Sequence, residues 1–262
     1  MPQSLLGKVA VVTGGSRGIG KGIALALGKA GATVYISGRT LHAGGSIWSG
    51  SITETANEIT QLGSRGIAVC CDHHHDAEVQ ALFQQVHNEQ GQLDVLVNNA
   101  TSFGDTATGY PPEEVPFWEL PLTLWDEMHT VGLRSHYVAS AFAAPMLIGQ
   151  RRGLIVNISS AGAANYAFNA AYGVAKAGLD KLTADMAHDL RPYGVTVVSL
   201  WPPFTRTEKY LAHSDQYDLT RAQSPEFTGR AIVALASDPT LVEKTGRVLR
   251  VTDLASEYGI AD

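Results

Sequence analysis

The sequence predicts an α/β fold in which a doubly wound parallel sheet of about seven strands carries helices on both faces. Three observations lead to this class: continuous apolar runs, helical apolar spacing between those runs, and a glycine-rich turn after the first run. The chain has 262 residues, of which 45% are hydrophobic and 17% are charged. This length and composition predict a single domain over residues 1–262.

The expected strands are short apolar segments separated by helical patterns. They cover residues 9–12, 33–37, 66–70, 93–97, 154–158, 195–200 and 247–251. The expected helices cover residues 53–62, 78–88, 122–147 and 170–191, and Pro145 is expected to bend or end the third of these. Three longer segments interrupt the pattern at 40–50, 101–121 and 203–225, and the last two are expected to be substrate loops.

The glycine-rich turn is Thr13-Gly14-Gly15-Ser16-Arg17-Gly18-Ile19-Gly20, and apolar residues at helical spacing follow it. A strand, a glycine loop and a helix in this order predict a cradle for the pyrophosphate of a dinucleotide at the helix N-terminus. Gly14 permits the tight turn, Gly18 lets the backbone approach the phosphates, and Gly20 allows close helix packing. The expected cofactor contacts here are Gly14, Ser16, Arg17, Gly18, Ile19 and Gly20. A purely structural turn is the alternative for the loop alone.

Tyr172 and Lys176 stand four residues apart in a predicted helix and therefore share one face. At roughly 5 Å and an effective dielectric constant of about 20, the ammonium would favour the phenolate by about 3 kcal/mol, or roughly two pKa units. The pKa of Tyr172 is then expected to fall from about 10 to about 8, a range that suits proton transfer. A strand ending in Asn157-Ile158-Ser159-Ser160 precedes this pair.

These motifs, together with Asn98-Asn99-Ala100 and the segment 202–207, resemble the short-chain dehydrogenase/reductase family over nearly the whole chain. Segments 131–134, 198–202 and 253–259 resemble the member 1 branch of that family. The resemblance implies a Rossmann fold and hydride transfer between a nicotinamide cofactor and a hydrophobic ketone, aldehyde or secondary alcohol. Enoyl reduction or epimerisation on the same scaffold remains open. A non-catalytic dinucleotide sensor is the alternative of a different class, although such sensors typically lose the tyrosine–lysine pair.

The resemblance also implies the roles of the catalytic residues. Tyr172 would be the general acid and base, and Lys176 would hold the nicotinamide ribose and lower the pKa of the tyrosine. A serine hydroxyl would polarise the substrate carbonyl. Ser160 is the choice for this role as the second serine of the motif, although Ser159 has the commoner spacing from Tyr172.

Further cofactor contacts follow from the same resemblance. Asp72 would bind the adenine amino group, the backbone near Asn98 and Ala100 would hold the adenosine ribose, and Asn99 would brace the central sheet. Contacts near the nicotinamide would come from Pro202, Thr205 and Thr207. The chain departs from the family pattern at two positions: Pro203 replaces a glycine, and Gly132 replaces an asparagine that completes a proton relay in many relatives.

Cofactor choice depends on the end of the second expected strand. An acid there would accept hydrogen bonds from the ribose 2′-hydroxyl of NAD, but this chain has Gly38 followed by Arg39. Arg39 and Arg17 together suit a 2′-phosphate, so NADP(H) is favoured over NAD(H). Arg39 as a surface cation is the alternative.

Charge and cysteine content restrict the partners and the compartment. The net charge of −6 and the pI near 5.8 argue against nucleic acid and an anionic membrane as partners. No signal peptide or membrane span is expected. Cys70 and Cys71 are adjacent, which is poor geometry for a structural disulfide and favours a reducing, cytoplasmic location.

Two further expectations concern metals and assembly. The run Asp72-His73-His74-His75-Asp76 lacks further ligands at zinc spacing, so no metal site is expected and the run is interpreted as a solvated loop. A homodimer or homotetramer is expected, because in relatives the two long helices build an interface between subunits. Small residues on those helices would permit close approach; they are Ala139, Ala143, Ala175 and Ala184.

Overall fold

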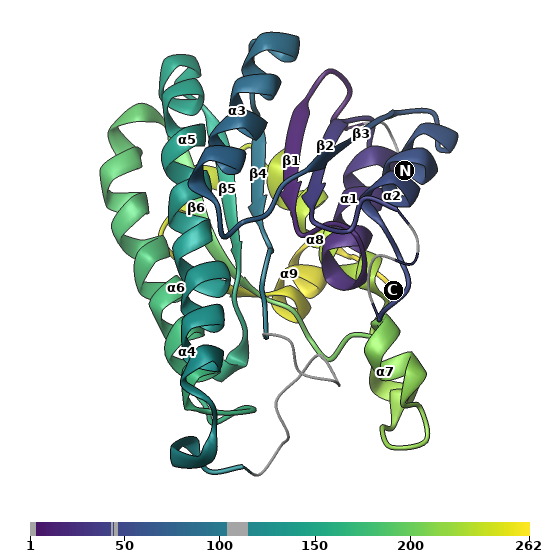
Figure 1. The fold of residues 1–262 in the computed structure, drawn as a ribbon. Helices are drawn as coiled ribbons and strands as arrows, with labels where there is room; N and C mark the ends of the chain where they lie inside the picture. Colours follow the sequence, from purple (N-terminus) through teal and green to yellow (C-terminus); the bar gives the residue numbers. More distant parts are fainter. Residues whose placement is uncertain (1–3, 43, 45–46, 104–114) are drawn as a thin grey trace.

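The computed structural model describes residues 4–42, 44, 47–103 and 115–262. Seven parallel strands form one sheet in the order β3-β2-β1-β4-β5-β6-β7 (Figure 1). Each predicted strand is present, which confirms the predicted fold class. The strands are β1 Val9–Thr13, β2 Thr33–Gly38, β3 Arg65–Cys70, β4 Val95–Asn98, β5 Gly153–Ile158, β6 Val195–Trp201 and β7 Val248–Arg250.

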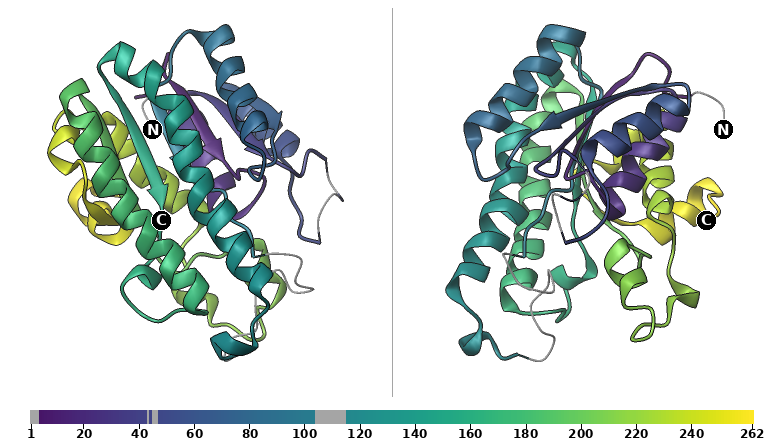
Figure 2. Two further views of the ribbon diagram at one scale, coloured as in Figure 1. Left: turned by 60° about the vertical axis from the view of Figure 1, so that its left-hand side comes forward. Right: turned by 45° about the vertical axis from the view of Figure 1, so that its right-hand side comes forward.

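Helices cover both faces of the sheet (Figure 2). One face carries α1 (Gly18–Lys29), α2 (Ile52–Gln61), α8 (Pro225–Ser237) and α9 (Val251–Tyr258). The other face carries α3 (Asp76–Gln90), α5 (Ser135–Gln150) and α6 (Ala170–Leu190). Two shorter helices, α4 (Leu122–His129) and α7 (Glu208–Ala212), lie beyond the carboxyl ends of the strands (Figure 1). None of the helices in the described ranges is long and apolar enough to cross a bilayer.

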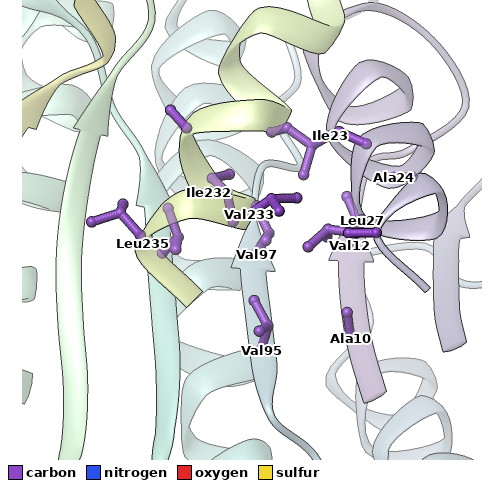
Figure 3. Close-up of a cluster of buried hydrophobic side chains, with 14 of the residues drawn as sticks. Ala10, Val12, Ile23, Ala24, Leu27, Val95, Val97, Ile232, Val233 and Leu235 are labelled. Atoms are coloured by element: carbon purple, nitrogen blue, oxygen red, sulfur yellow. The ribbon is translucent and has the colours of Figure 1, made fainter. Parts of the chain in front are cut away.

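The helix that follows the glycine loop, α1, packs closely against α8, and this contact fixes its position. A Cβ at Gly22 would lie 2.2 Å from the carbonyl carbon of Pro225, and one at Gly229 would lie 2.6 Å from the Cβ of Ala26. Only glycine allows this approach. Beneath the two helices, buried aliphatic side chains from α1, α8, β1 and β4 form one hydrophobic core (Figure 3). The N-terminus of α1 is therefore held at a fixed place at the edge of the sheet.

On the face of the sheet that carries α3, α5 and α6, a row of buried polar side chains borders the hydrophobic core at the carboxyl ends of the strands. The row crosses adjacent strands in register on one face and consists of Ser37, Thr13, Asn98, Asn157 and Ser199. Asn98 Nδ2 donates to Asn157 Oδ1 at 2.9 Å, and Asn157 Nδ2 donates to the hydroxyl of Thr183 at 2.9 Å. Buried polar atoms need such partners, so the row fixes how the strand ends lie beside the site.

The long helix expected over 122–147 is interrupted. Residues 130–134 form a turn of π-helix between α4 and α5, and the hydroxyl of Ser135 donates to the carbonyl of Val131 at 2.6 Å. Pro145 was expected to bend or end the helix, but α5 continues past it to Gln150. The carbonyl that loses its partner at Pro145 belongs to Ala141, an exposed residue whose carbonyl water can reach.

The structure weakens the sequence argument for a subunit interface. Ala139 and Ala143 of α5 are fully buried, and Ala175 of α6 is 2% exposed. Of the four alanines expected at an interface, Ala184 alone is exposed. The other three are small because their helices pack on their own sheet.

Candidate active site

Tyr172 lies in the first turn of α6, and the cap of that helix places it. Asn169 precedes the helix, and its Oδ1 accepts the backbone N–H of Tyr172 at 2.9 Å. The phenol donates to Ser160 Oγ at 2.9 Å, and the N–H of Gly162 also donates to Ser160 Oγ at 3.1 Å. Since Ser160 Oγ accepts both bonds, its own hydrogen is available to donate to a substrate oxygen.

Lys176 lies one turn further along α6 and is 7% exposed. Its Nζ donates to the carbonyl of Ile158 at 2.9 Å and lies 5.7 Å from the ring centroid of Tyr172. Burial lowers the pKa of Lys176 to about 8, although the charge of Asp180 acts in the opposite direction. The site therefore holds a buried cation that titrates close to neutral pH.

The expected fall in the pKa of Tyr172 is not found. Burial raises the pKa of Tyr172, and the hydrogen bond to Ser160 only partly opposes this rise. The ammonium of Lys176 is directed to a backbone carbonyl instead of the phenol. The expectation was based on the charge of Lys176 alone. The fold also removes both groups from water, and this burial is the largest effect on the pKa of Tyr172.

The two adjacent serines have different surroundings. Ser159 is 3% exposed, and its hydroxyl donates to the carbonyl of Lys176 at 3.1 Å. Ser160 bonds to the phenol of Tyr172 instead. Because side chains alternate along extended backbone, one serine faces the helix and the other faces the site. This geometry favours Ser160 as the hydroxyl that meets the substrate.

Apolar side chains surround the phenol of Tyr172. Phe168 contacts its ring edge to face at a centroid distance of 4.9 Å, and Phe103 stacks on it at 6.1 Å. Leu124 and Met128 of α4 belong to the same buried cluster. Phe168 has a φ of 57°, an uncommon conformation for a bulky residue, and such strain is often found at functional sites.

The glycine loop has the geometry of a phosphate cradle. Gly14 has a φ of 66°, and a Cβ there would lie 2.8 Å from the Cα of Ala100. A Cβ at Gly20 would lie 2.3 Å from the carbonyl oxygen of Gly14. Asn99 Nδ2 donates to the carbonyls of Thr13 and Gly14, each at 3.0 Å. Asn99 thus braces the glycine loop, while the side chain of Asn98 joins the polar row.

An anion of the protein itself occupies the N-terminus of α1. The N–H of Gly18 donates to Glu208 Oε2 at 2.9 Å. Backbone N–H groups at a helix N-terminus bind carboxylates and phosphates by the same dipole and hydrogen bonds. A carboxylate at this position indicates that these donors suit the pyrophosphate of a dinucleotide.

Arg17 connects the glycine loop to the segment 40–50. Its guanidinium donates to the carbonyls of Ser49 and Gly50, each at 3.0 Å, and to the hydroxyl of Thr40 at 3.2 Å. Burial lowers the pKa of Arg17, and the carboxylate of Glu208 opposes this change. The guanidinium remains charged, because an arginine side chain is not deprotonated in proteins.

The remaining predicted cofactor contacts lie near the adenosine end. Asp72 Oδ1 accepts the N–H of His74 at 3.0 Å and its Nδ1–H at 2.7 Å. Burial acts to raise the pKa of Asp72, but the bonds to His74 outweigh it and lower that pKa. Arg39 is exposed, and no ion pair within the described ranges includes it. Ser16 is buried and Ile19 is half-buried within the glycine loop.

The segment from Pro202 to Thr207 reaches the glycine loop. Thr205 is 4% exposed, and its hydroxyl donates to the carbonyl of Pro203 at 2.8 Å. The methyl carbon of Thr207 lies 3.4 Å from the position that a Cβ on Gly18 would take. Thr207 is therefore the better candidate for a cofactor contact, because the hydroxyl of Thr205 is engaged inside the loop. Pro202 is half-buried beside it.

The histidine run at 73–75 is partly buried, in contrast to the expected solvated loop. His73 is 5% exposed, and its Nε2 lies 2.9 Å from Ser37 Oγ. His74 lies between the carboxylates of Asp72 and Glu127, whereas His75 bonds to Glu78. The three imidazoles contact different partners, an arrangement that does not direct them at one ion.

Sequence reasoning missed His136, which lies behind the site on α5. Its Nε2 donates to the carbonyl of Ala100 at 2.9 Å, while its buried Nδ1 has no partner among the described residues. Burial, and then the charge of Lys176, lowers the pKa of His136 to about 3. Gly132 lies one turn earlier, where a Cβ would be 3.4 Å from the hydroxyl of Thr101. No sequence signal marked His136, since its position depends on the π-helical turn.

Residues 8–217 match the family of short chain dehydrogenases. The chain belongs to this family. It is 44% identical to dehydrogenase/reductase SDR family member 1 of mouse and of human over 276 residues, an alignment that covers 100% of this chain and 85% of each relative. These relatives confirm the resemblance to the member 1 branch. The chain is also 30% identical to a 3-oxoacyl-[acyl-carrier-protein] reductase of Aquifex aeolicus, with 91% of this chain and 93% of that protein covered.

Solved structures support the same family. A putative dehydrogenase from Xanthomonas campestris superposes with a TM-score of 0.85 at 26% identity, covering 98% of this chain and 92% of that one. A 7α-hydroxysteroid dehydrogenase in complex with NADH and 7-oxo glycochenodeoxycholic acid superposes with a TM-score of 0.76 at 27% identity, covering 95% and 94%. The chain is therefore a short-chain dehydrogenase/reductase, for which NAD(P)(H) is the family's cofactor.

Proposed function

We propose that this protein is an NADP(H)-dependent oxidoreductase that interconverts a hydrophobic ketone or aldehyde and the corresponding alcohol. The cluster of Ser160, Tyr172 and Lys176 carries this proposal. It places a phenol 2.9 Å from a serine hydroxyl and one helical turn from a buried ammonium. Each group supplies a function that carbonyl reduction requires: a proton, a donor to the carbonyl oxygen, and a fixed positive charge.

The mechanism follows from these contacts. When bound, the nicotinamide supplies or accepts the hydride. Ser160 donates its free hydrogen to the substrate oxygen, and Tyr172 transfers its phenolic proton to that oxygen as negative charge develops there. Lys176 stabilises the tyrosinate that remains, since its Nζ lies 5.7 Å from the ring centroid. In alcohol oxidation the same groups act in reverse, with tyrosinate as the base.

The neighbouring residues support a hydrophobic substrate. The ring of Tyr172 lies between Phe103 and Phe168, and the buried cluster continues into Leu124 and Met128. An apolar carbonyl compound would replace water at this surface, which strengthens the hydrogen bonds to its oxygen. The related hydroxysteroid dehydrogenase structure contains a bulky oxo-steroid, so steroids belong in the first substrate screen beside quinones and aromatic ketones.

NADP(H) is proposed over NAD(H) because of the charges near the end of β2. Gly38 ends the strand, and the exposed Arg39 follows it. The charges of Arg39 and Arg17 are close enough for Arg39 to lower the pKa of Arg17. Two guanidinium groups that repel each other would be stabilised by a 2′-phosphate between them.

The test is the variant Tyr172→Phe, which removes the transferable proton and keeps the ring. We expect NADPH to bind within a factor of about three of wild type, while kcat for carbonyl reduction falls by about 10²–10⁴. NADPH fluorescence measures binding, and the loss of absorbance at 340 nm measures turnover. More than a tenth of wild-type turnover in the variant would contradict Tyr172 as general acid. Cofactor binding by wild type without turnover of any carbonyl would favour the dinucleotide sensor.

The assembly and location are also proposals. We propose a homodimer or homotetramer formed through α5 and α6, on the resemblance to the family and not on the buried alanines of these helices, and a location in the cytoplasm. Cys70 and Cys71 are both free thiols, and burial raises the pKa of Cys71 to about 12, so it resists oxidation. Light scattering at micromolar concentration tests the assembly, and the 27.8 kDa mass of one chain would refute it.

A further inference from the structure

Glu208 is the first residue of α7, and its carboxylate accepts the N–H of Gly18 at 2.9 Å. The two residues are 190 positions apart, so this contact joins the segment after β6 to the phosphate cradle. The contact uses a donor at the N-terminus of α1, where the glycine loop and helix dipole also favour a phosphate. A pyrophosphate and a carboxylate cannot share the donor, and their charges repel.

Two more contacts hold α7 against the cofactor-binding elements. The methyl of Thr207 lies beside Gly18, and His213, after the end of α7, packs edge to face on Trp48 at a centroid distance of 6.1 Å. Trp48 belongs to the same segment, 40–50, that Arg17 binds through its carbonyls. The residues that flank α7 thus contact Gly18 on one side and Trp48 on the other, and in Figure 1 the helix lies beyond the ends of the strands.

The segment around α7 is packed as one unit. Phe204 contacts Tyr210, and Tyr210 contacts Tyr217, each at a centroid distance of 4.8 Å and near right angles. Edge-to-face aromatic pairs stabilise a segment beyond the area that they bury, so these rings pack the segment onto α7. The same segment, 203–225, is the expected substrate loop.

We propose that Glu208 limits cofactor affinity by holding the phosphate-binding end of α1, and that an arriving dinucleotide displaces it and releases α7. This inference rests on the proposed function, because it requires a nicotinamide dinucleotide at this cradle. Its consequence is that cofactor binding and the position of α7 are coupled, because a bound dinucleotide leaves α7 without its contact at Gly18.

The first experiment compares Glu208→Gln with wild type. Glutamine keeps an oxygen that can accept from Gly18 and removes only the charge. We expect Kd for NADPH, measured by its fluorescence, to fall about tenfold. The matched control is Asp215→Asn, which removes one charge at an exposed position in the same segment and should leave Kd within twofold of wild type. Equal or weaker NADPH binding by Glu208→Gln would overturn the inference.

Inorganic pyrophosphate carries the charged group of the cofactor without the nicotinamide. Its affinity therefore tests competition with Glu208 apart from any effect at the nicotinamide end. It should compete with NADPH about tenfold more strongly in Glu208→Gln than in wild type. An unchanged pyrophosphate affinity would overturn competition at the cradle. If the wild-type protein binds neither NADPH nor NADH, the proposed function itself fails. If it binds NADPH and the Glu208→Gln variant binds it equally well, only the inference about Glu208 fails.

Release of α7 has its own measurement. Lys209 lies within the helix, so tryptic cleavage after this residue reports its opening. NADPH should speed this cleavage in wild type, and Glu208→Ala should be cleaved quickly even without NADPH. Slower cleavage on addition of NADPH, or resistance of Glu208→Ala, would overturn the proposed release.

Discussion

The cluster of Ser160, Tyr172 and Lys176 and the loop from Gly14 to Gly20 lie at the same edge of the sheet but are held by different contacts. Around Tyr172 the partners are backbone and hydroxyl groups of β5 and α6, and Lys176 is 7% exposed. Around Gly18 and Arg17 the partners are distant in sequence and come from α7 and from the residues before α2.

This difference fits the role proposed for each region. Groups that must act on a reacting atom need a fixed geometry before the substrate arrives, which buried contacts within one supersecondary unit supply. A region that admits a large, charged cofactor needs contacts that can be exchanged, and a carboxylate on a backbone N–H is such a contact. The proposed catalytic cluster is therefore preorganised, whereas the glycine loop bonds to an anion that we propose a cofactor replaces.

The sharpest test of the proposed catalytic cluster compares Ser160 with the adjacent Ser159, which lies outside the cluster. Ser160→Ala removes the donor to the substrate oxygen and should lower kcat by about 10²–10³. Ser159→Ala removes only a hydrogen bond to the carbonyl of Lys176, so it should cost about 1 kcal/mol of folding stability and leave kcat near wild type. Steady-state kinetics and urea unfolding on both variants check this. A larger kcat loss in Ser159→Ala would assign the role to the other serine.

Acid titration tests whether water reaches His73, which is 5% exposed and lies beside Ser37 at the end of the polar row. Burial lowers the pKa of His73 to about 4, from about 6.5 in an unfolded chain. The unfolded chain therefore takes up this proton first, and the free energy of unfolding falls as pH drops below about 6.5 towards 4. Between pH 7 and pH 5, His73 should account for about 2 kcal/mol of this loss.

The variant His73→Asn removes this titration, so its free energy of unfolding should fall by about 2 kcal/mol less than that of wild type over the same pH range. Urea unfolding at both pH values measures the difference. The buried His136 titrates in both proteins, so its contribution cancels. An identical fall in the two proteins would mean that water reaches His73.

The smallest expected effect concerns the exchangeable contacts at the adenosine end. Arg39→Asp replaces a phosphate partner by an acceptor for the ribose 2′-hydroxyl, so the preference for NADPH over NADH should fall by about tenfold or more. The ratio of kcat/KM for the two cofactors measures it. Arg65→Asp, an exposed change at the start of β3, is the control. A constant ratio in Arg39→Asp would show that the 2′ position is recognised by other residues.

Local sequence patterns predicted the order of the strands, the glycine loop and the shared helix face of Tyr172 and Lys176. Apolar runs and helical spacing are local patterns, and each strand follows from its own residues. A spacing of four on a helix fixes a shared face in any fold that keeps the helix.

The tertiary structure alone decided how these groups behave. The pKa of Tyr172 rises because the fold removes the phenol from water, an effect that no spacing encodes. Ser160 lies in the site and Ser159 outside it because the end of β5 meets α6 at one orientation. Glu208 reaches Gly18 across 190 positions, a contact that depends on the path of the chain after β6. Burial and long-range contacts are properties of the packed molecule, so local sequence patterns did not predict them.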